Sequence, residues 1–457
     1  MEKDVNIFFH ETTGLLGSEQ KGTALLQFKV LKGSQFQCVY LEVNNSSFSL
    51  RLLLYLLNNN INIYITSSVH NGKKIPAFCD AVILNPKAFD TELTLIRNEN
   101  FVRSESLQIN SGSILMSTSG STGKPKFIVF EKNKLFSNGQ RVVTHLKLNR
   151  ESRVLVPVPV GHMFGLGVGV IPGLIAGADI HLIEKNNILK LYEQLQIYRP
   201  DVTLITPAMV DMMLQFRKPT VKTKFISAGD HLDHSVAKEF QTSFGTLINL
   251  YGCSEMGAMG TSADDYADDH NIIFPFEGVT LKIDQNSSSE ILCFRDDRFK
   301  FYVDEFGDKT DDDNGGWYRT NDRGEATSNG GIRVLGRLND TINRLGFLLS
   351  YNEIEIRLQA EFPDFQKILI TKGKHYGMHG VDMVAFFEYH IDFTSQRAEQ
   401  VWLQCKRCLQ NHFKPDYIYF VKKLPRLQNG KIDRVIINEK LINYEQTDRH
   451  EKYSIIG

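Results

Sequence analysis

The chain has 457 residues, which is enough for two or more domains that each bury their own core. Lys and Arg number 52 against 53 Asp and Glu, so the formal net charge of −1 gives no bulk basic surface for nucleic acid. The apolar run at 163–178 is shorter than the roughly 20 residues that cross a membrane. It contains Pro172 and predicts a buried helix or a cleft lining, not a membrane span.

The first hundred residues alternate apolar runs with turn-forming clusters. Ser46-Ser47 predicts the start of a helix that runs to about Leu57. Strands are predicted at 6–10, 25–30, 38–43 and 61–65. This alternation is typical of a mostly parallel sheet covered by helices. The chain opens on charged residues and its six cysteines are scattered, so we expect a cytoplasmic protein with reduced thiols.

Residues 118–126 read Thr-Ser-Gly-Ser-Thr-Gly-Lys-Pro-Lys and lie between two apolar runs, 113–116 and 127–130. Glycines let backbone N–H groups turn toward an anion, hydroxyl groups add donors, and lysines add positive charge. The segment fails the Walker A pattern, because Thr118 and Pro125 occupy two of its fixed positions. It is predicted to be a phosphate-binding loop between two strands.

Further along, 152–160 is predicted to be extended, and 202–206 and 224–227 to be buried strands. The polar stretches 264–270 and 304–316 are predicted to be exposed loops. An amphipathic helix is predicted over 395–413, where Cys405 and Cys408 form a Cys-x-x-Cys pair with no second pair to complete a zinc site. A composition change near Asn339 predicts a domain boundary.

Four further segments follow the loop in order. They are Asn249-Leu250-Tyr251-Gly252-Cys253-Ser254-Glu255, then Trp317-Tyr318-Arg319-Thr320-Asn321-Asp322, then Gly336-Arg337-Leu338-Asn339-Asp340, and finally Leu424-Pro425-Arg426 with Asn429-Gly430-Lys431-Ile432. Together with the loop, these five motifs resemble those of the adenylate-forming superfamily, which includes acyl-CoA synthetases, aryl-acid ligases, peptide-synthetase adenylation domains and luciferases. In this resemblance the third segment is the hinge segment and the last is the C-terminal lysine motif.

The resemblance implies an α/β fold. A large N-terminal domain, 1–338, would contain mixed, mostly parallel sheets with helices. A small C-terminal α+β domain, 339–457, would follow on a hinge. The glycine-rich loop comes early for the superfamily, so the N-terminal domain is expected to be shortened.

The resemblance also implies the ATP site. Glu255 would bind Mg²⁺, Tyr251 would stack on adenine, Ser254 would contact the α-phosphate, and Asp322 would accept the ribose hydroxyls. Asn321 replaces the usual glycine and is expected to tolerate a positive φ. The full set of implied ATP and AMP ligands is Thr118, Ser119, Gly120, Ser121, Thr122, Gly123, Lys126, Gly229, Asp230, Asn249, Tyr251, Gly252, Ser254, Asp322 and Arg337.

Three further roles come from the resemblance. Lys431 would bridge the attacking carboxylate and the α-phosphate, and Asn339 would be the hinge about which the C-terminal domain rotates between two half-reactions. His162 would line the acid site and gate entry of a thiol, although a lone His beside an apolar helix is often a core residue. The acid pocket would comprise His162, Phe164, Gly165, Cys253, Met256 and Gly257.

The predicted function is ATP-dependent activation of an aryl or fatty acid to an acyl-adenylate, followed by transfer to the thiol of coenzyme A or of a carrier protein's phosphopantetheine. Mg²⁺ is the expected cofactor, and a monomer or homodimer is expected. An amino-acid adenylation domain is disfavoured, because no Asp lies between Pro157 and Gly177 to hold an amino group. A catalytically silent binding protein and a luciferase-type oxidative enzyme remain alternatives.

Overall fold

The structure is a computed structural model, and its described residues divide into two compact units. The larger comprises 1–281 and 292–318, and the smaller comprises 282–291 and 319–457. The structure describes residues 36–67, 75–83, 96–107, 112–118, 126–183, 188–215, 223–229, 232, 234–263, 269, 271–285, 289–310, 315–338, 341–344, 347–377, 380–389, 393–409, 413–426, 432–434, 436–437 and 453–456.

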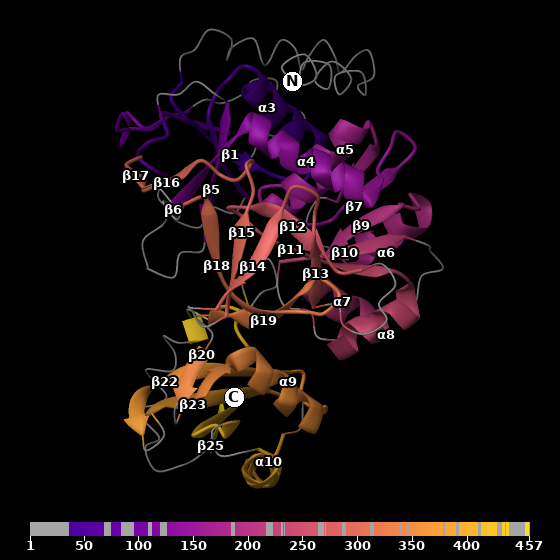
Figure 1. The fold of residues 1–457 in the computed structure, drawn as a ribbon, viewed down its shortest axis with the longest axis vertical. Coiled ribbons are helices and arrows are strands. Elements are labelled where there is room, and N and C mark those ends of the chain that lie inside the picture. The colour runs from indigo at the N-terminus through magenta and orange to yellow at the C-terminus, as the bar shows by residue number, and fades with distance from the viewer. Residues whose placement is uncertain are drawn as a thin grey trace. The chain divides into compact units, whose positions relative to one another are not determined.

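The first sheet of the larger unit contains eight described strands in the order β17-β16-β6-β5-β2-β1-β3-β4. Figure 1 labels β17, β16, β6, β5 and β1 of this sheet. Its central strands β1, β2, β3 and β5 are parallel, and β6 and β16 run antiparallel to their neighbours. The strands are β1 (Val39–Val43), β2 (Ile63–Ser67), β3 (Ala81–Ile83), β4 (Ile96–Arg97), β5 (Ser113–Thr118), β6 (Lys126–Glu131), β16 (Phe301–Val303) and β17 (Lys309–Thr310).

The second sheet of the larger unit is parallel from β8 to β11 and antiparallel from β11 to β13. Its strand order is β8-β7-β9-β10-β11-β12-β13. The strands are β7 (Arg153–Val156), β8 (Asp179–Leu182), β9 (Val202–Ile205), β10 (Lys224–Ser227), β11 (Leu247–Cys253), β12 (Gly257–Thr261) and β13 (Ile272–Pro275).

Helices bury one extensive apolar core against these sheets. The helix α3 begins where Ser46 Oγ accepts a hydrogen bond from the N–H of Ser49, which is an N-cap contact. The helices are α3 (Ser47–Asn58), α4 (Lys132–Leu146), the π-helix η1 (Phe164–Val170), α5 (Ile171–Ala176), α6 (Ile188–Ile197), α7 (Pro207–Leu214) and α8 (His234–Phe244). The wide turns of η1 run directly into α5.

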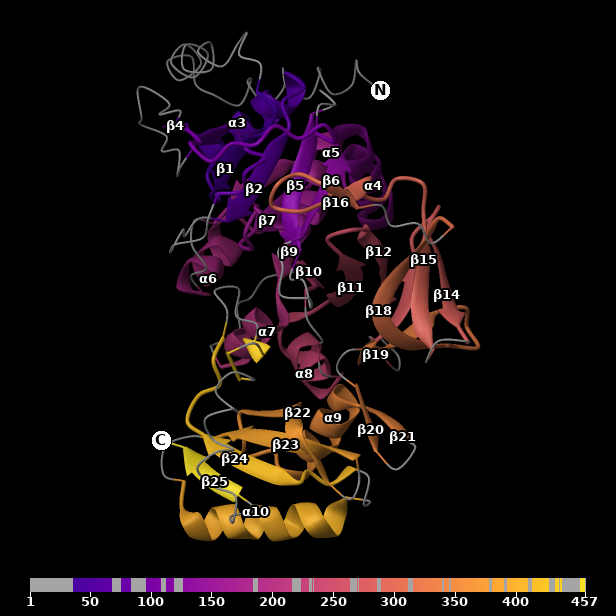
Figure 2. The ribbon, with the colours of Figure 1, turned by 90° about the vertical axis from the view of Figure 1, so that its left-hand side faces the viewer.

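Four more strands lie at or beyond the division between the units: β14 (Thr280–Asp284), β15 (Glu290–Phe294), β18 (Trp317–Ala326) and β19 (Ile332–Arg337). In the smaller unit, β20 (Thr341–Arg344), β21 (Phe347–Ser350), β22 (Lys367–Gly377), β23 (Gly380–Glu388), β24 (Tyr417–Val421) and β25 (Tyr453–Ile456) form a sheet. The helices α9 (Tyr351–Glu361) and α10 (Ser395–Cys408) share one apolar core with it (Figure 2).

The structure confirms the predicted mixed α/β fold. It also confirms, to within two residues at each end, the strands predicted at 38–43, 61–65, 113–116, 127–130, 202–206 and 224–227. Three predicted bounds were wrong. The extended run from 152 ends as a strand at Val156, the C-terminal helix ends at Cys408, and β17 interrupts the loop predicted at 304–316. The strands predicted at 6–10 and 25–30 lie outside the described residues, as does nearly all of the loop predicted at 264–270.

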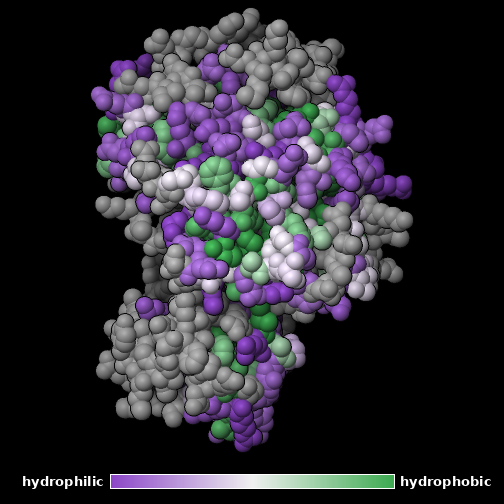
Figure 3. Space-filling model, viewed as in Figure 1, coloured by the Kyte–Doolittle hydropathy of each residue, from purple (hydrophilic) through white to green (hydrophobic). Residues whose placement is uncertain are grey.

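The apolar run at 163–178 is a buried pair of helices, η1 and α5, as predicted. Within the described residues, no helix is long and apolar enough to span a membrane. On the face shown in Figure 3, most of the described surface of the larger unit is hydrophilic, and hydrophobic residues gather near its centre. This pattern agrees with a composition that is 23% charged.

Candidate active site

The predicted phosphate loop connects two antiparallel strands, β5 and β6. Thr118 ends β5, Lys126 begins β6, and the two residues are partners in the strand register. The loop is therefore bounded by two strands, as predicted from the flanking apolar runs. Residues 119–125, which include Ser119, Gly120, Ser121, Thr122 and Gly123, lie outside the described residues.

The motif from Asn249 to Glu255 forms one arm and the tip of a hairpin. Tyr251, Gly252 and Cys253 end β11 opposite β12, and the register shifts between Tyr251 and Gly252 as in a β-bulge. Ser254, Glu255 and Met256 form the turn between the strands. Bulges and turns of this kind aim side chains away from a sheet, so the hairpin presents Tyr251, Ser254 and Glu255 at one tip.

Glu255 sits beside two tyrosines from other strands. The hydroxyl of Tyr302 donates to Glu255 Oε1 at 3.4 Å, and the backbone N–H of Phe299 donates to the Glu255 carbonyl at 3.0 Å. Tyr302 and Tyr318 share a hydrogen bond through their side chains. Burial, and then the neighbouring Cys253, Glu255 and Tyr302, raises the pKa of Tyr318 far above its usual value, so its hydroxyl stays protonated.

The surroundings of Glu255 fit a magnesium ligand. Its carboxylate is half-buried, and Mg²⁺ takes one or two protein carboxylates together with phosphate oxygens and waters. Among the described residues, no group of three or more His, Cys, Asp and Glu could hold a metal ion.

Lys126 also lies close to Tyr302. Its Nζ is 5.7 Å from the centroid of the Tyr302 ring, within the range of a cation–π contact. Tyr302 therefore touches both the lysine at the end of the phosphate loop and the candidate magnesium ligand. Tyr302 lies in β16 and belongs to none of the sequence motifs, so the motifs do not identify it.

Three of the residues predicted to line the acid site, His162, Phe164 and Gly165, lie just before η1 or in its first turn. His162 is exposed, Phe164 is half-buried, and the carbonyl of His162 accepts from the N–H of Leu166. Gly165 has no room for a side chain, since a Cβ there would lie 2.4 Å from the carbonyl oxygen of Pro159. Only glycine lets the helix approach the backbone of the preceding residues so closely.

The parallel strand β10 ends beside the hairpin strand β11. Ser227 ends β10 and is the register partner of Asn249 in β11, and Gly229 follows with a φ of +100°. The Oγ of Ser227 is buried and has no hydrogen-bond partner among the described residues. Asp230, a predicted ligand of the nucleotide, lies outside the described residues.

In the smaller unit, Asp322 and Arg337 face each other across β18 and β19. Arg337 Nε lies 3.0 Å from Asp322 Oδ1, and its Nη1 donates to the carbonyl of Thr320 at 3.1 Å. Asn321 has a φ of +57°, which confirms the positive φ expected where the family has glycine. Its N–H donates to Glu290 Oε1 at 2.9 Å, and this contact holds the turn before Asp322.

The described residues on either side of Lys431 are anchored to the smaller unit. Arg426 and Ile432 form a β-bridge, and the Asp433 N–H donates to the carbonyl of Pro425. Arg434 Nη2 lies 3.2 Å from Glu355 Oε1 in α9. Lys431 itself and the predicted hinge Asn339 lie outside the described residues, so their roles and the boundary after Leu338 stay predictions.

A shallow hollow elsewhere in the larger unit has a volume of about 460 Å³ and is lined in part by Ser152, Asp201 and Thr223. These residues precede β7, β9 and β10. Ser227 and Asn249 instead lie at or toward the carboxyl ends of β10 and β11, where ligands bind in open α/β sheets. The hollow is therefore not the predicted acid site.

The core around the hairpin contains two polar residues that the motifs do not mark. Asn138 of α4 and Arg295, which follows β15, are both fully buried and contact the backbone at 256–258. The backbone groups at 256–258 that they contact lie 37 to 120 residues away along the chain, so no local signal identifies these contacts.

The Tyr-Gly-Cys-Ser-Glu hairpin, and the predicted phosphate loop between β5 and β6, correspond to the motifs that resemble the adenylate-forming superfamily. A family model described as "AMP-binding enzyme" matches residues 56–291. The chain belongs to this family and is thus an ATP-dependent, AMP-forming ligase.

Similar proteins include carrier-protein ligases. The 3,4-dihydroxybenzoate–[aryl-carrier protein] ligase of Bacillus anthracis is 23% identical over 348 residues, covering 74% of this chain and 77% of that protein. The D-alanine–D-alanyl carrier protein ligase of Lactococcus lactis is 24% identical over 364 residues, covering 74% and 72%. The crystal structure of ATP-bound MatB from Rhodopseudomonas palustris superposes with a TM-score of 0.76 at 18% identity, covering 94% and 92%.

Proposed function

We propose that the protein activates an aryl carboxylic acid as an acyl-adenylate and passes the acyl group to the phosphopantetheine thiol of a carrier protein. The observation that carries the choice of acid is the lining of the predicted pocket. No Asp or Glu lies between Pro157 and Gly177, and η1 consists of apolar residues and glycines. An apolar acid suits such a lining better than an amino acid with a charged ammonium group, and the name of the Bacillus anthracis relative points to an aryl acid.

The acceptor is proposed from two observations. Both curated relatives named above are ligases that act on carrier proteins. The sequence also shows no cluster of Lys and Arg suited to the 3′-phosphate of coenzyme A. Phosphopantetheine carries the same reactive thiol as coenzyme A without that phosphate, so a carrier protein is the favoured acceptor.

The chemistry assigns each part of the site a role. Attack of a carboxylate on the α-phosphate brings two anions together, so the site must neutralise charge and orient both partners. Lys126 and the backbone of Gly120–Gly123 would hold the outer phosphates, and Glu255 would hold Mg²⁺. When bound, Mg²⁺ neutralises phosphate charge. Lys431 would contact both reacting groups, and Asp322 would bind the ribose.

An isotope-exchange panel tests the acid class. The protein is incubated with ATP, Mg²⁺ and labelled pyrophosphate together with benzoate, a dihydroxybenzoate, a medium-chain fatty acid or D-alanine. We expect exchange that depends on the aryl acids. Exchange with D-alanine alone would instead support the amino-acid alternative that the Lactococcus relative represents. No exchange with any acid would support a silent binding protein.

A second assay tests the acceptor. Acyl transfer is measured from the best acid to coenzyme A, to pantetheine and to a carrier protein with its phosphopantetheine attached. We expect the carrier protein to give the highest rate at equal thiol concentration. Faster transfer to coenzyme A would overturn the carrier-protein proposal and leave acid activation standing. Oxygen uptake or light emission on adding the acid would indicate a luciferase-type enzyme.

A further inference from the structure

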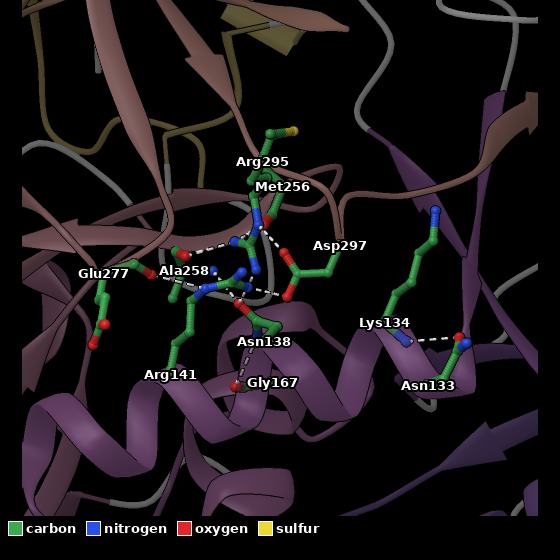
Figure 4. A network of polar contacts seen from close by, with 10 residues as sticks. All are labelled: Asn133, Lys134, Asn138, Arg141, Gly167, Met256, Ala258, Glu277, Arg295 and Asp297. Carbon is green, nitrogen blue, oxygen red and sulfur yellow. Dashed lines mark hydrogen bonds and ion pairs between the residues drawn. The ribbon is translucent and has the colours of Figure 1, made fainter. Parts of the chain in front are cut away.

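Arg295 is a charged residue with a fully buried side chain in the core of the larger unit. Its Nη1 donates to the carbonyls of Met256 at 2.5 Å and Ala258 at 2.8 Å, and its Nε donates to Asp297 Oδ1 at 2.7 Å (Figure 4). A buried guanidinium is costly unless its donors are satisfied. Here they are used to hold the backbone on both sides of Gly257.

Asn138 continues the same network from helix α4 (Figure 4). Its Oδ1 accepts from the Ala258 N–H at 3.1 Å and from Arg295 Nη2 at 3.2 Å. Its Nδ2 donates to the carbonyl of Gly167 in η1 at 3.3 Å. A single buried amide therefore joins the π-helix to the first residues of β12.

The contact between Asn138 and the hairpin is tightly packed. Gly257 has a φ of +67°, and a Cβ at this position would lie 2.7 Å from Asn138 Oδ1. The side chain of Arg141, also in α4, pairs with Asp297 and donates to the carbonyl of Glu277 at 2.9 Å. The network is thus braced from α4 and from the segment after β15.

The two segments that Asn138 joins are both predicted to line the acid pocket. Phe164 and Gly165 lie in η1, and Cys253, Met256 and Gly257 lie in the hairpin. A π-helix has wider turns than an α-helix and recurs at functional sites. The hydrogen bond to Gly167 O fixes this unusual helix against the hairpin.

We propose that Asn138, supported by Arg295, is a positioning residue that sets the spacing of the two pocket walls and thereby the size of acid the enzyme accepts. The inference rests on the proposed function, because it takes these segments to line the acid site. Asn138 itself touches neither acid nor nucleotide in this proposal. An apolar pocket discriminates by roughly 10- to 200-fold for one methylene, so a shift of one wall is measurable as a change in selectivity.

The substitution Asn138→Asp separates the two sets of hydrogen bonds that Asn138 makes: those of Oδ1 with the Ala258 N–H and Arg295, and that of Nδ2 with the Gly167 carbonyl. A carboxylate still accepts from the Ala258 N–H and from Arg295, but it cannot donate to the Gly167 carbonyl. The kcat/KM ratio between benzoate and a para-extended benzoate is expected to shift by about tenfold toward the longer acid. The KM for ATP is expected to stay near the wild-type value.

Hydrogen exchange gives a readout that does not depend on activity. Asn138→Asp should speed amide exchange in peptides covering 164–170 and leave those covering 257–261 unchanged. Asn138→Ala removes the hydrogen bonds to Ala258 and Arg295 as well as the one to Gly167, and should speed exchange in both peptides. It also carries the test if Asn138→Asp does not fold.

The control is Thr203→Val. Thr203 is fully buried, and its hydroxyl is 3.1 Å from that of Thr223 near the amino ends of β9 and β10. This variant should lower the melting temperature and keep the wild-type acid ratio.

An unchanged acid ratio in Asn138→Asp, with exchange like that of wild type in 164–170, would overturn the proposal. If wild type activates no aryl acid, the proposed function fails separately, and the ratio is measured between a shorter and a longer member of the acid class that the panel identifies.

Discussion

The hydroxyl of Tyr302 lies 3.4 Å from Oε1 of Glu255, and the ring of Tyr302 lies 5.7 Å from Nζ of Lys126. One side chain thus contacts the candidate magnesium ligand and the cation that closes the phosphate loop. A neutral donor beside a carboxylate limits its rotation and stabilises its charge. Tyr302 is therefore suited to hold Glu255 in one orientation.

Tyr302→Phe tests this relationship. The variant keeps the ring beside Lys126 and removes the hydroxyl that orients Glu255. Because hydrogen bonds to charged groups contribute about 1.5 to 3 kcal/mol and this one is long, we expect the Mg²⁺ concentration for half-maximal pyrophosphate exchange to rise about tenfold.

Tyr192→Phe is the matched control, since the Tyr192 hydroxyl donates to the carbonyl of Met213 at 2.8 Å. That variant should keep the wild-type magnesium dependence. A magnesium titration of Tyr302→Phe that overlays wild type would show that the contact with Glu255 has no functional role.

Glu255→Gln removes the carboxylate and keeps its size. We expect ATP-dependent exchange to fall sharply and to recover in part at high Mg²⁺, because mass action offsets a weakened site. Magnesium titrations of the variant, of wild type and of Glu239→Gln, an exposed glutamate in α8, provide the comparison. An unchanged magnesium requirement would remove Glu255 from the metal site.

Asp322→Asn tests the predicted ribose contact. A carboxylate accepts both ribose hydroxyls, whereas an amide offers one oxygen. Wild type is expected to prefer ATP to 2′-deoxy-ATP, and the variant to lose about tenfold of that preference in kcat/KM. The control is Glu325→Gln on the same strand, where the side chain is exposed and paired with Arg333. Equal preference for ATP in wild type and in Asp322→Asn would contradict the assignment.

Asp297 makes stability depend on pH at the acid end. Burial alone raises the pKa of Asp297, but the hydrogen bond and charge of Arg295, together with Arg141, outweigh it and hold the pKa below its usual value. A depressed carboxyl pKa contributes stability above the unfolded-state value of about 3.9, and this contribution is lost as pH falls through the folded-state value.

Asp297→Asn is expected to lower the free energy of unfolding by about 3 kcal/mol at neutral pH, as for a broken buried ion pair. It should also flatten the fall in stability as pH drops below about 4, because the contribution of Asp297 is lost between the unfolded-state pKa and the lower folded-state pKa. Urea unfolding across this range measures both effects. The exposed Asp201, paired with Arg153 at 3.7 Å, gives the control Asp201→Asn, which should keep the wild-type slope. A parallel fall in wild type and Asp297→Asn would contradict the linkage.

Much of this fold was predictable, because local signals and the final packing agree. Apolar runs placed β1, β5 and β10, and the capping residue Ser46 placed the start of α3. The positive φ of Asn321 followed from a single substitution at a turn that the family builds with glycine. These features depend on residues close together in the chain.

The rest depends on contacts between distant residues. The glycines of 163–178 allow several helical hydrogen-bond patterns, and the π form of η1 is fixed in part by Asn138 binding the carbonyl of Gly167. Arg295 lies in a charged stretch that reads as surface, and it is buried because Met256, Ala258 and Asn138 accept its donors. Tyr302 approaches Glu255 across 47 residues of sequence. No local pattern predicts such pairings.

Lys431→Ala tests whether the C-terminal unit serves one half-reaction. Lys431 follows Asn429-Gly430, a pair that is predicted to form a turn, and is predicted to contact the attacking carboxylate and the α-phosphate. Loss of one preorganised cationic stabiliser should slow adenylate formation by about 10²- to 10³-fold. Thioester formation from a supplied acyl-adenylate should stay near the wild-type rate, because that step does not use the lysine in the rotating-domain scheme.

Both half-reactions are measured on one preparation, with Lys422→Ala, an exposed lysine of the same unit, as the control. Equal loss in both steps would count against rotation of the C-terminal unit, and full retention of adenylation would remove Lys431 from the active site.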